Sequence, residues 1–282
     1  MRKLSVHCAF VTGGSSGIGF AVAQELIRRG SKVLLIARNL EHLREAALQL
    51  EKASNVREEE GKPSPKVSVL SLDVGDGQAV SQLIPKAVKE FGEPDLVVNC
   101  AGEAYCQYFE ATSDAVFEQT LSVHVRGAWY LTKALIPYLK KNKGSIVYVS
   151  SLAGLMGVFG YSAYSTAKAA LIGLAEALRS ELKPEGVRVA VLCPPDTDTP
   201  GFEKENRTKP PETRVISANA GVLKAEVVAR ELFRGLEQGH FLIVPGAEAK
   251  LTAWAMQHLP RLVYWVIDRA VRNCRKQMRP SS

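Results

Sequence analysis

Short apolar runs alternate along this chain with longer stretches in which apolar residues recur every three or four positions. The short runs are typical of buried strands, and the three-to-four spacing is typical of helices with one buried face. Their alternation predicts an α/β fold with a doubly wound parallel sheet and helices on both faces. In such a sheet ligands bind at the carboxyl ends of the strands. The predicted strands are residues 7–13, 32–38, 66–74, 95–102, 145–151, 187–193 and 241–245.

Helical spacing fills most of the intervals between these strands. Two segments lack either pattern and are predicted to be loops. The first is the polar stretch 54–65, and the second is 195–222, which is long and polar like the loops that close over substrates. The predicted helices cover 17–29, then run to about 53, to about 91, through the long stretch before 145, from about 164 to 182, and over 225–238.

The chain of 282 residues, 46% of them hydrophobic, is long enough to bury one large core. Without internal repeats, it is read as one domain of residues 1–249, with the substrate loop 195–222, and an extension of residues 250–282. Five cysteines without Cys-x-x-Cys spacing predict free thiols in a reducing compartment and no metal site. Residues 1–5 lead straight into the first strand, so we expect neither a signal peptide nor an N-terminal anchor.

The net charge of +7 is concentrated at the C-terminal end. From residue 250 onward seven basic residues stand against one acidic residue, whereas the first 249 residues carry 29 basic and 28 acidic ones. A nearly neutral body argues against a nucleic-acid partner, and a basic tail favours a local anionic one such as a membrane surface. The apolar segment 251–267 is too interrupted to span a membrane. It fits a helix lying on a membrane and a helix packed on the body equally well.

Glycines follow the first predicted strand in the pattern Thr12-Gly-Gly-Ser-Ser-Gly-Ile-Gly19. In a strand–turn–helix context, glycines let the backbone approach a pyrophosphate, whose charge is met by the helix N-terminus. This predicts a Rossmann-type dinucleotide site. The second strand ends in Arg38 and has no acidic residue there, which favours the 2′-phosphate of NADPH over the free hydroxyl of NADH.

Tyr164 and Lys168 are four residues apart in a predicted helix and therefore share one face. A phenol beside an ammonium is a candidate proton donor, and the positive charge is expected to favour its ionised form. Ser151 ends the preceding strand, so all three side chains can reach the strand ends.

Together with Asn99-Cys-Ala-Gly102, these motifs resemble the short-chain dehydrogenase/reductase family over residues 7 to about 245. The resemblance implies that Tyr164 gives a proton to a substrate carbonyl as hydride arrives, that Lys168 eases this transfer, and that Ser151 stabilises the developing alkoxide. It implies cofactor contacts at Gly13, Ser15, Ser16, Gly17, Ile18, Gly19, Arg38, Asp73, Val74, Asn99, Ala101, Gly102, Tyr164, Lys168, Pro194, Thr197 and Thr199.

The chain departs from that family at His124, in the run Ser122-Val-His-Val-Arg-Gly127. The family commonly has an asparagine there, whose main chain holds a water that leads protons to the lysine. His124 is therefore a candidate catalytic residue in two ways. It either relays a proton itself or packs and holds water through its backbone.

The stretch from Pro194 to Arg214 resembles that of 3-ketodihydrosphingosine reductases. This implies NADPH-dependent reduction of the 3-keto group of 3-dehydrosphinganine, a long-chain keto-amine, in sphingolipid biosynthesis. Asp196, Asp198 or Glu205 would then pair with the substrate ammonium. The alternatives are reduction of another hydrophobic ketone, such as a steroid, retinoid or fatty-acyl carbonyl, and a non-catalytic NADPH-binding scaffold.

The same resemblance implies a homodimer or homotetramer, since the family often pairs subunits through the helix that carries Tyr164 and Lys168. It also suggests a place in the cytoplasm or on the cytoplasmic face of a membrane, the endoplasmic reticulum if the cell is eukaryotic. The membrane contact is expected through residues 250–282.

Overall fold

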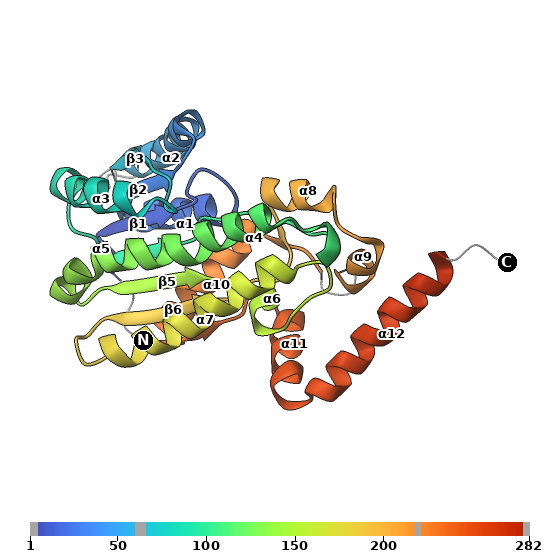
Figure 1. The fold of residues 1–282 in the computed structure, drawn as a ribbon. Helices are drawn as coiled ribbons and strands as arrows, with labels where there is room; N and C mark the ends of the chain where they lie inside the picture. Colours follow the sequence, from blue (N-terminus) through green and yellow to red (C-terminus); the bar gives the residue numbers. More distant parts are fainter. Residues whose placement is uncertain (1–4, 60–65, 218–220, 279–282) are drawn as a thin grey trace.

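A computed structural model describes residues 5–59, 66–217 and 221–278 of the chain. Seven parallel strands form its central sheet in the order β3-β2-β1-β4-β5-β6-β9 (Figure 1), which confirms the predicted doubly wound sheet. The order reverses between β1 and β4, and this is where such sheets bind their ligands. The strands are β1 (Cys8–Thr12), β2 (Lys32–Ala37), β3 (Val67–Ser71), β4 (Leu96–Asn99), β5 (Ser145–Val149), β6 (Arg188–Leu192) and β9 (Leu242–Ile243).

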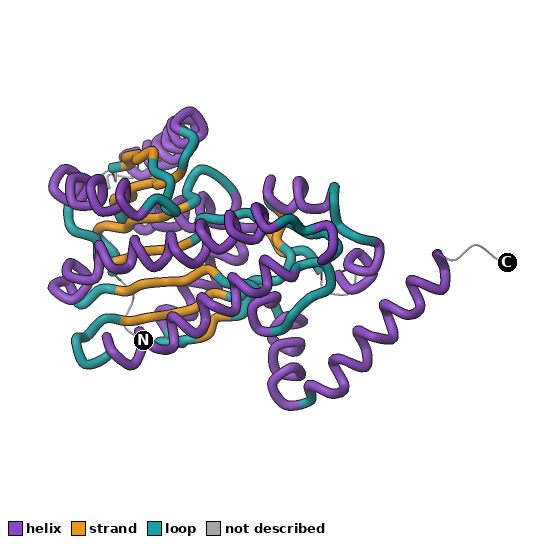
Figure 2. The backbone as a smooth tube through the Cα atoms, in the orientation of Figure 1, coloured by secondary structure: helices purple, strands orange, loops and turns teal. Residues whose placement is uncertain are grey.

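Helices cover both faces of this sheet, as Figure 2 shows in purple against the orange strands. The first strand illustrates why, because its residues alternate between two cores. Ala9 and Val11 pack with the helices of one face, and Cys8 and Phe10 with those of the other. The first face holds α1 (Gly17–Arg29), α2 (Leu40–Glu59) and α10 (Ala225–Glu237), and the second holds α3 (Gly77–Phe91), α5 (Gly127–Asn142) and α7 (Ser162–Leu182).

The predicted loop 54–65 is wrong in its first half, because α2 continues to Glu59. Polar residues such as arginine and glutamate are good helix formers, and no glycine or proline interrupts the chain between Leu40 and Gly61. The remainder, residues 60–65, lies outside the described part of the chain.

The described residues of the predicted loop 195–222 are folded rather than an open loop. Strand β7 (Thr197–Asp198) pairs with β8 (Leu223–Lys224) and closes its base, and helices α8 (Pro200–Asn206) and α9 (Pro211–Ser217) lie between them. The sequence explains why α8 begins here, since Thr199 caps the helix and Pro200 occupies its first turn.

The chain ends in two further helices, α11 (Ala247–His258) and α12 (Pro260–Met278). They break at Leu259, whose backbone is not helical, immediately before Pro260. Helix α12 runs out from α11 and approaches α9 with its far end (Figure 1). In the described residues, no helix combines the length and the apolar character that crossing a membrane requires.

Candidate active site

One large cavity opens at the carboxyl ends of the strands. Its volume is about 1240 Å³, above the roughly 300–1,000 Å³ of typical small-molecule pockets, so it suits a cofactor and a substrate together. Apart from Asn99, every residue predicted from the sequence to be catalytic or to bind the cofactor lines this cavity. The structure therefore brings these residues together at one cavity, and the role of each stays a prediction.

The glycine turn after β1 has the shape that a phosphate group needs. A Cβ on Gly19 would lie 2.3 Å from the carbonyl oxygen of Gly13, and Gly13 and Gly17 have φ angles of 65° and 55°, which favour glycine. The first turn of α1 lines the cavity directly behind Ser15 and Ser16. Its first N–H groups have no acceptor within the helix. The turn thus fits the pyrophosphate of a dinucleotide.

The hydroxyl of Thr12 fixes the strand end opposite this turn. Its Oγ1 accepts hydrogen bonds from the N–H groups of Cys100 (2.9 Å) and Ala101 (3.0 Å), and it donates to the carbonyl of Val98. This contact turns the chain after β4 so that Cys100 to Gly102 line the cavity. Sequence reasoning treated Thr12 only as the start of the glycine motif. Its bond to a strand 86 residues away was not visible there.

The end of β2 brings a positive charge to the far wall of the cavity. Arg38 lines the cavity together with Asn39 and His42, and its side chain is exposed there. Asp73 and Val74 line the same wall from the end of β3. The Asp73 carboxylate accepts a hydrogen bond from the N–H of Gly75 at 2.9 Å, so it is held in its own turn.

Ser151, Tyr164 and Lys168 meet in the centre of the cavity. Ser151 follows β5 and caps the short helix α6 (Leu152–Leu155), where its Oγ accepts from the N–H of Ala153 at 3.1 Å. Tyr164 shares a hydrogen bond with Ser151. The Lys168 ammonium lies 5.3 Å from the centre of the Tyr164 ring, and it donates to the carbonyl oxygen of Val149 at 2.8 Å.

Residues 7–210 match the family described as short chain dehydrogenase. The chain belongs to this family. Curated relatives include the 3-ketodihydrosphingosine reductase of Bos taurus, 44% identical over 233 residues that make up 82% of this chain and 68% of the relative. The protein of the same name from Dictyostelium discoideum is 37% identical over 260 residues, or 89% of this chain and 78% of the relative. The 3-dehydrosphinganine reductase of Danio rerio is 42% identical over 242 residues, or 85% and 71%.

Solved structures agree in fold. An alcohol dehydrogenase from Thermococcus sibiricus in complex with 5-hydroxy-NADP is 27% identical, with a TM-score of 0.70 over 84% of this chain and 95% of the other. A short chain dehydrogenase/reductase from Burkholderia phymatum with NAD has a TM-score of 0.78 at 23% identity, over 93% of this chain and 96% of the other. As a short chain dehydrogenase with these relatives, the chain is an NAD(P)-dependent oxidoreductase.

The pKa values at the dehydrogenase centre are set mainly by burial. Burial raises the pKa of Tyr164, and the nearby Glu205 carboxylate adds to the increase, which the hydrogen bond with Ser151 only partly opposes. The pKa of Tyr164 is therefore raised and not lowered as expected, because burial outweighs the effect of the neighbouring ammonium. Burial also lowers the pKa of Lys168 to about 8. The phenol keeps its proton at neutral pH, whereas the ammonium is close to releasing its own.

His124 is a neutral imidazole at the rim of this centre. It lies in a π-helical turn, η2 (Ser122–Arg126), between α4 (Asp114–Leu121) and α5, and its ring meets that of Tyr164 edge-on at 5.6 Å. Burial, helped by the charge of Lys168, lowers its pKa to about 3. Nε2 lies 3.0 Å from the carbonyl oxygen of Glu103. Since a carbonyl only accepts, Nε2 carries the proton and Nδ1 has a lone pair.

Two buried polar atoms behind the cofactor wall, among the described residues, have no hydrogen-bond partner: Nδ1 of His124 and Nδ2 of Asn99. Both residues border a second void of about 10 Å³. One atom is an acceptor and the other a donor. A void of this size is close to the minimum that holds one water molecule.

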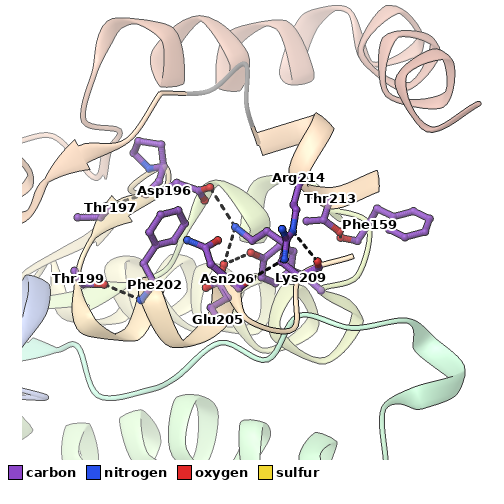
Figure 3. A network of polar contacts seen from close by, with 12 residues as sticks. Phe159, Asp196, Thr197, Thr199, Phe202, Glu205, Asn206, Lys209, Thr213 and Arg214 are labelled. Carbon is purple, nitrogen blue, oxygen red and sulfur yellow. Dashed lines mark hydrogen bonds and ion pairs between the residues drawn. The ribbon is translucent and has the colours of Figure 1, made fainter. Parts of the chain in front are cut away.

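A second polar cluster lies on the substrate side of the cavity and was missed as a unit by sequence reasoning (Figure 3). Lys209 forms ion pairs with Glu205 at 3.0 Å and with Asp196 at 3.5 Å. The hydroxyl of Tyr161 donates to Glu205, and burial raises the pKa of that carboxyl group. The Lys209 ammonium also lies 4.6 Å from the centre of the Phe202 ring.

The remaining predicted residues occupy the base of the folded substrate segment. Thr197 is buried and donates to the carbonyl of Pro195. Thr199 caps α8 by accepting from the N–H of Phe202 at 3.1 Å (Figure 3), and its side chain lies beside Gly17 of the glycine turn. Asp198 does not line the cavity, whereas Asp196 and Glu205 do. This separates the three acidic candidates for the substrate ammonium.

Proposed function

We propose that this chain reduces the 3-keto group of 3-dehydrosphinganine to the alcohol of sphinganine in sphingolipid biosynthesis, with NADPH as the cofactor. The observation that carries the proposal is the continuity of one cavity. Its lining combines the phosphate-shaped turn, Tyr164 and Lys168, the acidic Asp196 and an apolar wall on α11 and α12. A ketone that carries an amine on one side and a long alkyl chain on the other has a chemical group for each of the last three features. Relatives named for this reaction support the assignment.

NADPH, when bound, supplies the hydride that reduces the ketone. The glycine turn would hold its pyrophosphate, and Arg38 would pair with the 2′-phosphate, since no acid stands at the end of β2. Asp73 and Val74 would border the adenine, and Ala101 and Gly102 would border the ribose side. Pro194, Thr197 and Thr199 would contact the carboxamide and neighbouring phosphate from the opposite wall.

Tyr164 is proposed as the proton donor to the carbonyl oxygen. Its raised pKa keeps the phenol protonated until the oxygen becomes more basic, and the adjacent Lys168 ammonium stabilises the phenolate that remains. The Ser151 oxygen already accepts from Ala153, so its own O–H is available to donate to the developing alkoxide. Lys168 would also hold the nicotinamide ribose.

For His124 we propose a positioning role rather than proton relay. Its Nε2 proton points at a carbonyl that cannot pass it on, and burial disfavours a second proton. A water in the small void would donate to Nδ1 and accept from Asn99 Nδ2. A Cβ on Gly102 would lie 1.9 Å from the imidazole, so the ring also sets the position of the strand end. A high-resolution map without water density between His124 and Asn99 would contradict this role.

Asp196 is our choice for the partner of the substrate ammonium. Glu205 is engaged by both Tyr161 and Lys209, whereas Asp196 has a single ion pair at 3.5 Å. The two carboxylates and one lysine leave one negative charge at the cavity wall if all are ionised. Asp196→Asn should raise KM for the amino-ketone and leave KM unchanged for the same ketone without its amine. Equal effects on both ketones would refute the assignment.

The oligomeric state and the membrane contact are proposals as well. Small exposed residues along α7, among them Ala169, Ala170 and Gly173, leave a flat face that suits pairing of subunits into a homodimer or homotetramer. Basic residues of the extension 250–282 would contact the anionic cytoplasmic face of a membrane, the endoplasmic reticulum in a eukaryotic cell. Light scattering and sedimentation with phosphatidylserine vesicles test these two proposals separately.

The deciding experiment is NADPH oxidation with 3-dehydrosphinganine in mixed micelles, with NADH, a steroid ketone and Tyr164→Phe alongside. We expect turnover that prefers NADPH, is weak with the steroid, and falls about 10²–10⁴-fold in the variant. Faster reduction of the steroid would favour the alternative of another hydrophobic ketone. NADPH binding without turnover of either ketone would be consistent with the family assignment and would contradict the proposed substrate.

A further inference from the structure

The cavity does not end at the substrate segment but continues to the C-terminal helices. Its outer wall there consists of the apolar side chains Leu251 and Ala255 of α11 and Leu262, Val263, Val266 and Ile267 of α12. The same cavity contains Tyr164. A polar, reactive end and an apolar end therefore belong to one continuous space.

The apolar residues of α12 form one stripe along the helix. Leu262, Val263, Val266 and Ile267 recur at helical spacing. Arg261 and Arg272 lie on the opposite side of the helix and do not line the cavity. Leu262 and Val266 are nevertheless 53% and 52% exposed. Apolar surface that borders a ligand cavity but stays accessible indicates that an apolar ligand covers it.

An ion pair between an exposed arginine and a buried carboxylate joins the far end of α12 to α9. Arg275 donates to the Glu212 carboxylate of α9 at 2.9 Å, and the Glu212 side chain is only 2% exposed. The hydroxyl of Tyr108 donates to the other carboxylate oxygen at 3.0 Å, and Cys274 is buried beside this contact. Burial alone would raise the pKa of Glu212, but the hydrogen bonds from Arg275 and Tyr108 leave it lowered, so the charge is retained.

We propose that the apolar stripe of α12, with the facing residues of α11, is the binding subsite for the alkyl chain of the ketone substrate. The identity of this ligand rests on the proposed function. A membrane is the weaker occupant, because the stripe faces the cavity that holds Tyr164, whereas Tyr264 and Trp265 lie outside the cavity lining. The substrate would lie with its ketone at Tyr164 and its chain along α12.

A chain-length series tests the subsite. Each CH₂ that becomes buried should raise kcat/KM about fourfold until the stripe is filled. The substrates are 2-amino-3-ketones that lengthen two carbons at a time, used below their micelle concentrations. The matched variants are Val266→Asp and Tyr264→Asp. These positions are two residues apart and 52% and 51% exposed, but only Val266 lines the cavity.

We expect the wild type and Tyr264→Asp to show the same rise with chain length. Val266→Asp should lose most of the rise, so that the ratio of kcat/KM for the longest to the shortest ketone falls by tenfold or more. An equal increase of kcat/KM with chain length in all three proteins would overturn the proposal. So would a Val266→Asp protein that keeps its slope but no longer sediments with phosphatidylserine vesicles, because the stripe would then be a membrane contact.

Failure of the proposed reaction is recognised separately, since no member of the series would then turn over. Calorimetric binding of the corresponding long-chain amino-alcohols needs no turnover. The affinity should rise with chain length in the wild type and in Tyr264→Asp, and this rise should be lost in Val266→Asp. Affinities that do not depend on chain length would overturn the subsite even if the reaction itself is wrong.

Discussion

Two lysines, each only 4% exposed, differ in their partners: Lys168 lines this cavity, and Lys209 lies beside two acidic residues that line it. Lys168 of α7 has a backbone carbonyl and a tyrosine ring as neighbours. Lys209, between α8 and α9, faces the carboxylates of Glu205 and Asp196. Burial costs an ammonium group its hydration in both places, but only at Lys209 do opposite charges offset that cost.

The difference in partners gives the two lysines different roles, one in the reaction and one in holding the structure. Without a carboxylate beside it, Lys168 has its pKa lowered to about 8 by burial, which places proton exchange within the working range of an enzyme. With two carboxylates, Lys209 ties α8 and α9 to the segment after β6. The first lysine is suited to a reaction, and the second to holding the wall of a substrate site.

The largest contrast is expected on replacing Lys168. In Lys168→Met, kcat/KM should fall about 10²–10⁴-fold, because the Tyr164 phenolate loses its stabilising charge. The free energy of unfolding at pH 7 should not fall and should rise by about 1–3 kcal/mol. The folded state no longer buries an ammonium whose pKa it lowers from 10.5 to about 8, although one hydrogen bond is lost. Urea denaturation and steady-state kinetics measure the two effects.

Replacing Lys209 should do the reverse. Lys209→Met leaves Glu205 and Asp196 without their counter-charge and should lower the free energy of unfolding by about 3 kcal/mol. The double variant Glu205→Gln/Lys209→Met should recover part of this loss. As a control, Lys204→Met removes an exposed ion pair with Glu103 and should cost less than about 1 kcal/mol. Equal losses for Lys204 and Lys209 would contradict the structural role of the cluster.

A smaller effect is expected from pH. The ammonium form of Lys168 is lost as pH rises through about 8, so kcat/KM should decline above that value by up to tenfold per pH unit. His124 should contribute no limb between pH 5 and 8, because burial lowers its pKa to about 3. A limb near pH 6.5 that disappears in His124→Asn would restore the proton-relay interpretation. The Lys204→Met protein is the control here as well.

The parts of the structure that the sequence predicted are those with local causes. The apolar runs define the strands of the sheet, and helix α1 covers the predicted residues 17–29, with Gly30 as its C-cap. Glycine spacing and the interval between Tyr164 and Lys168 identify the site because each motif lies within a single turn or helix. The boundary of α2 was missed for a local reason too, since polar composition was taken for a loop.

The parts that escaped prediction depend on residues far apart in the sequence. The spacing of Glu205 and Lys209 is visible, but Tyr161, 44 residues earlier, completes their buried cluster. Glu212 and Arg275 are 63 residues apart, so the anchoring of α12 could not be read from the chain. The raised pKa of Tyr164 follows from how deeply the folded chain buries it, which motif spacing does not encode.

The most direct test of the two-lysine account is an NMR titration of the protein with ¹³C-labelled lysine side chains, in the wild type and in Lys168→Met. We predict one lysine Cε resonance with a midpoint near pH 8 that is absent from the variant. If every lysine resonance titrates at about pH 10 or above, or if the resonance near pH 8 persists in Lys168→Met, then Lys168 is not the poised ammonium on which this account of the active site depends.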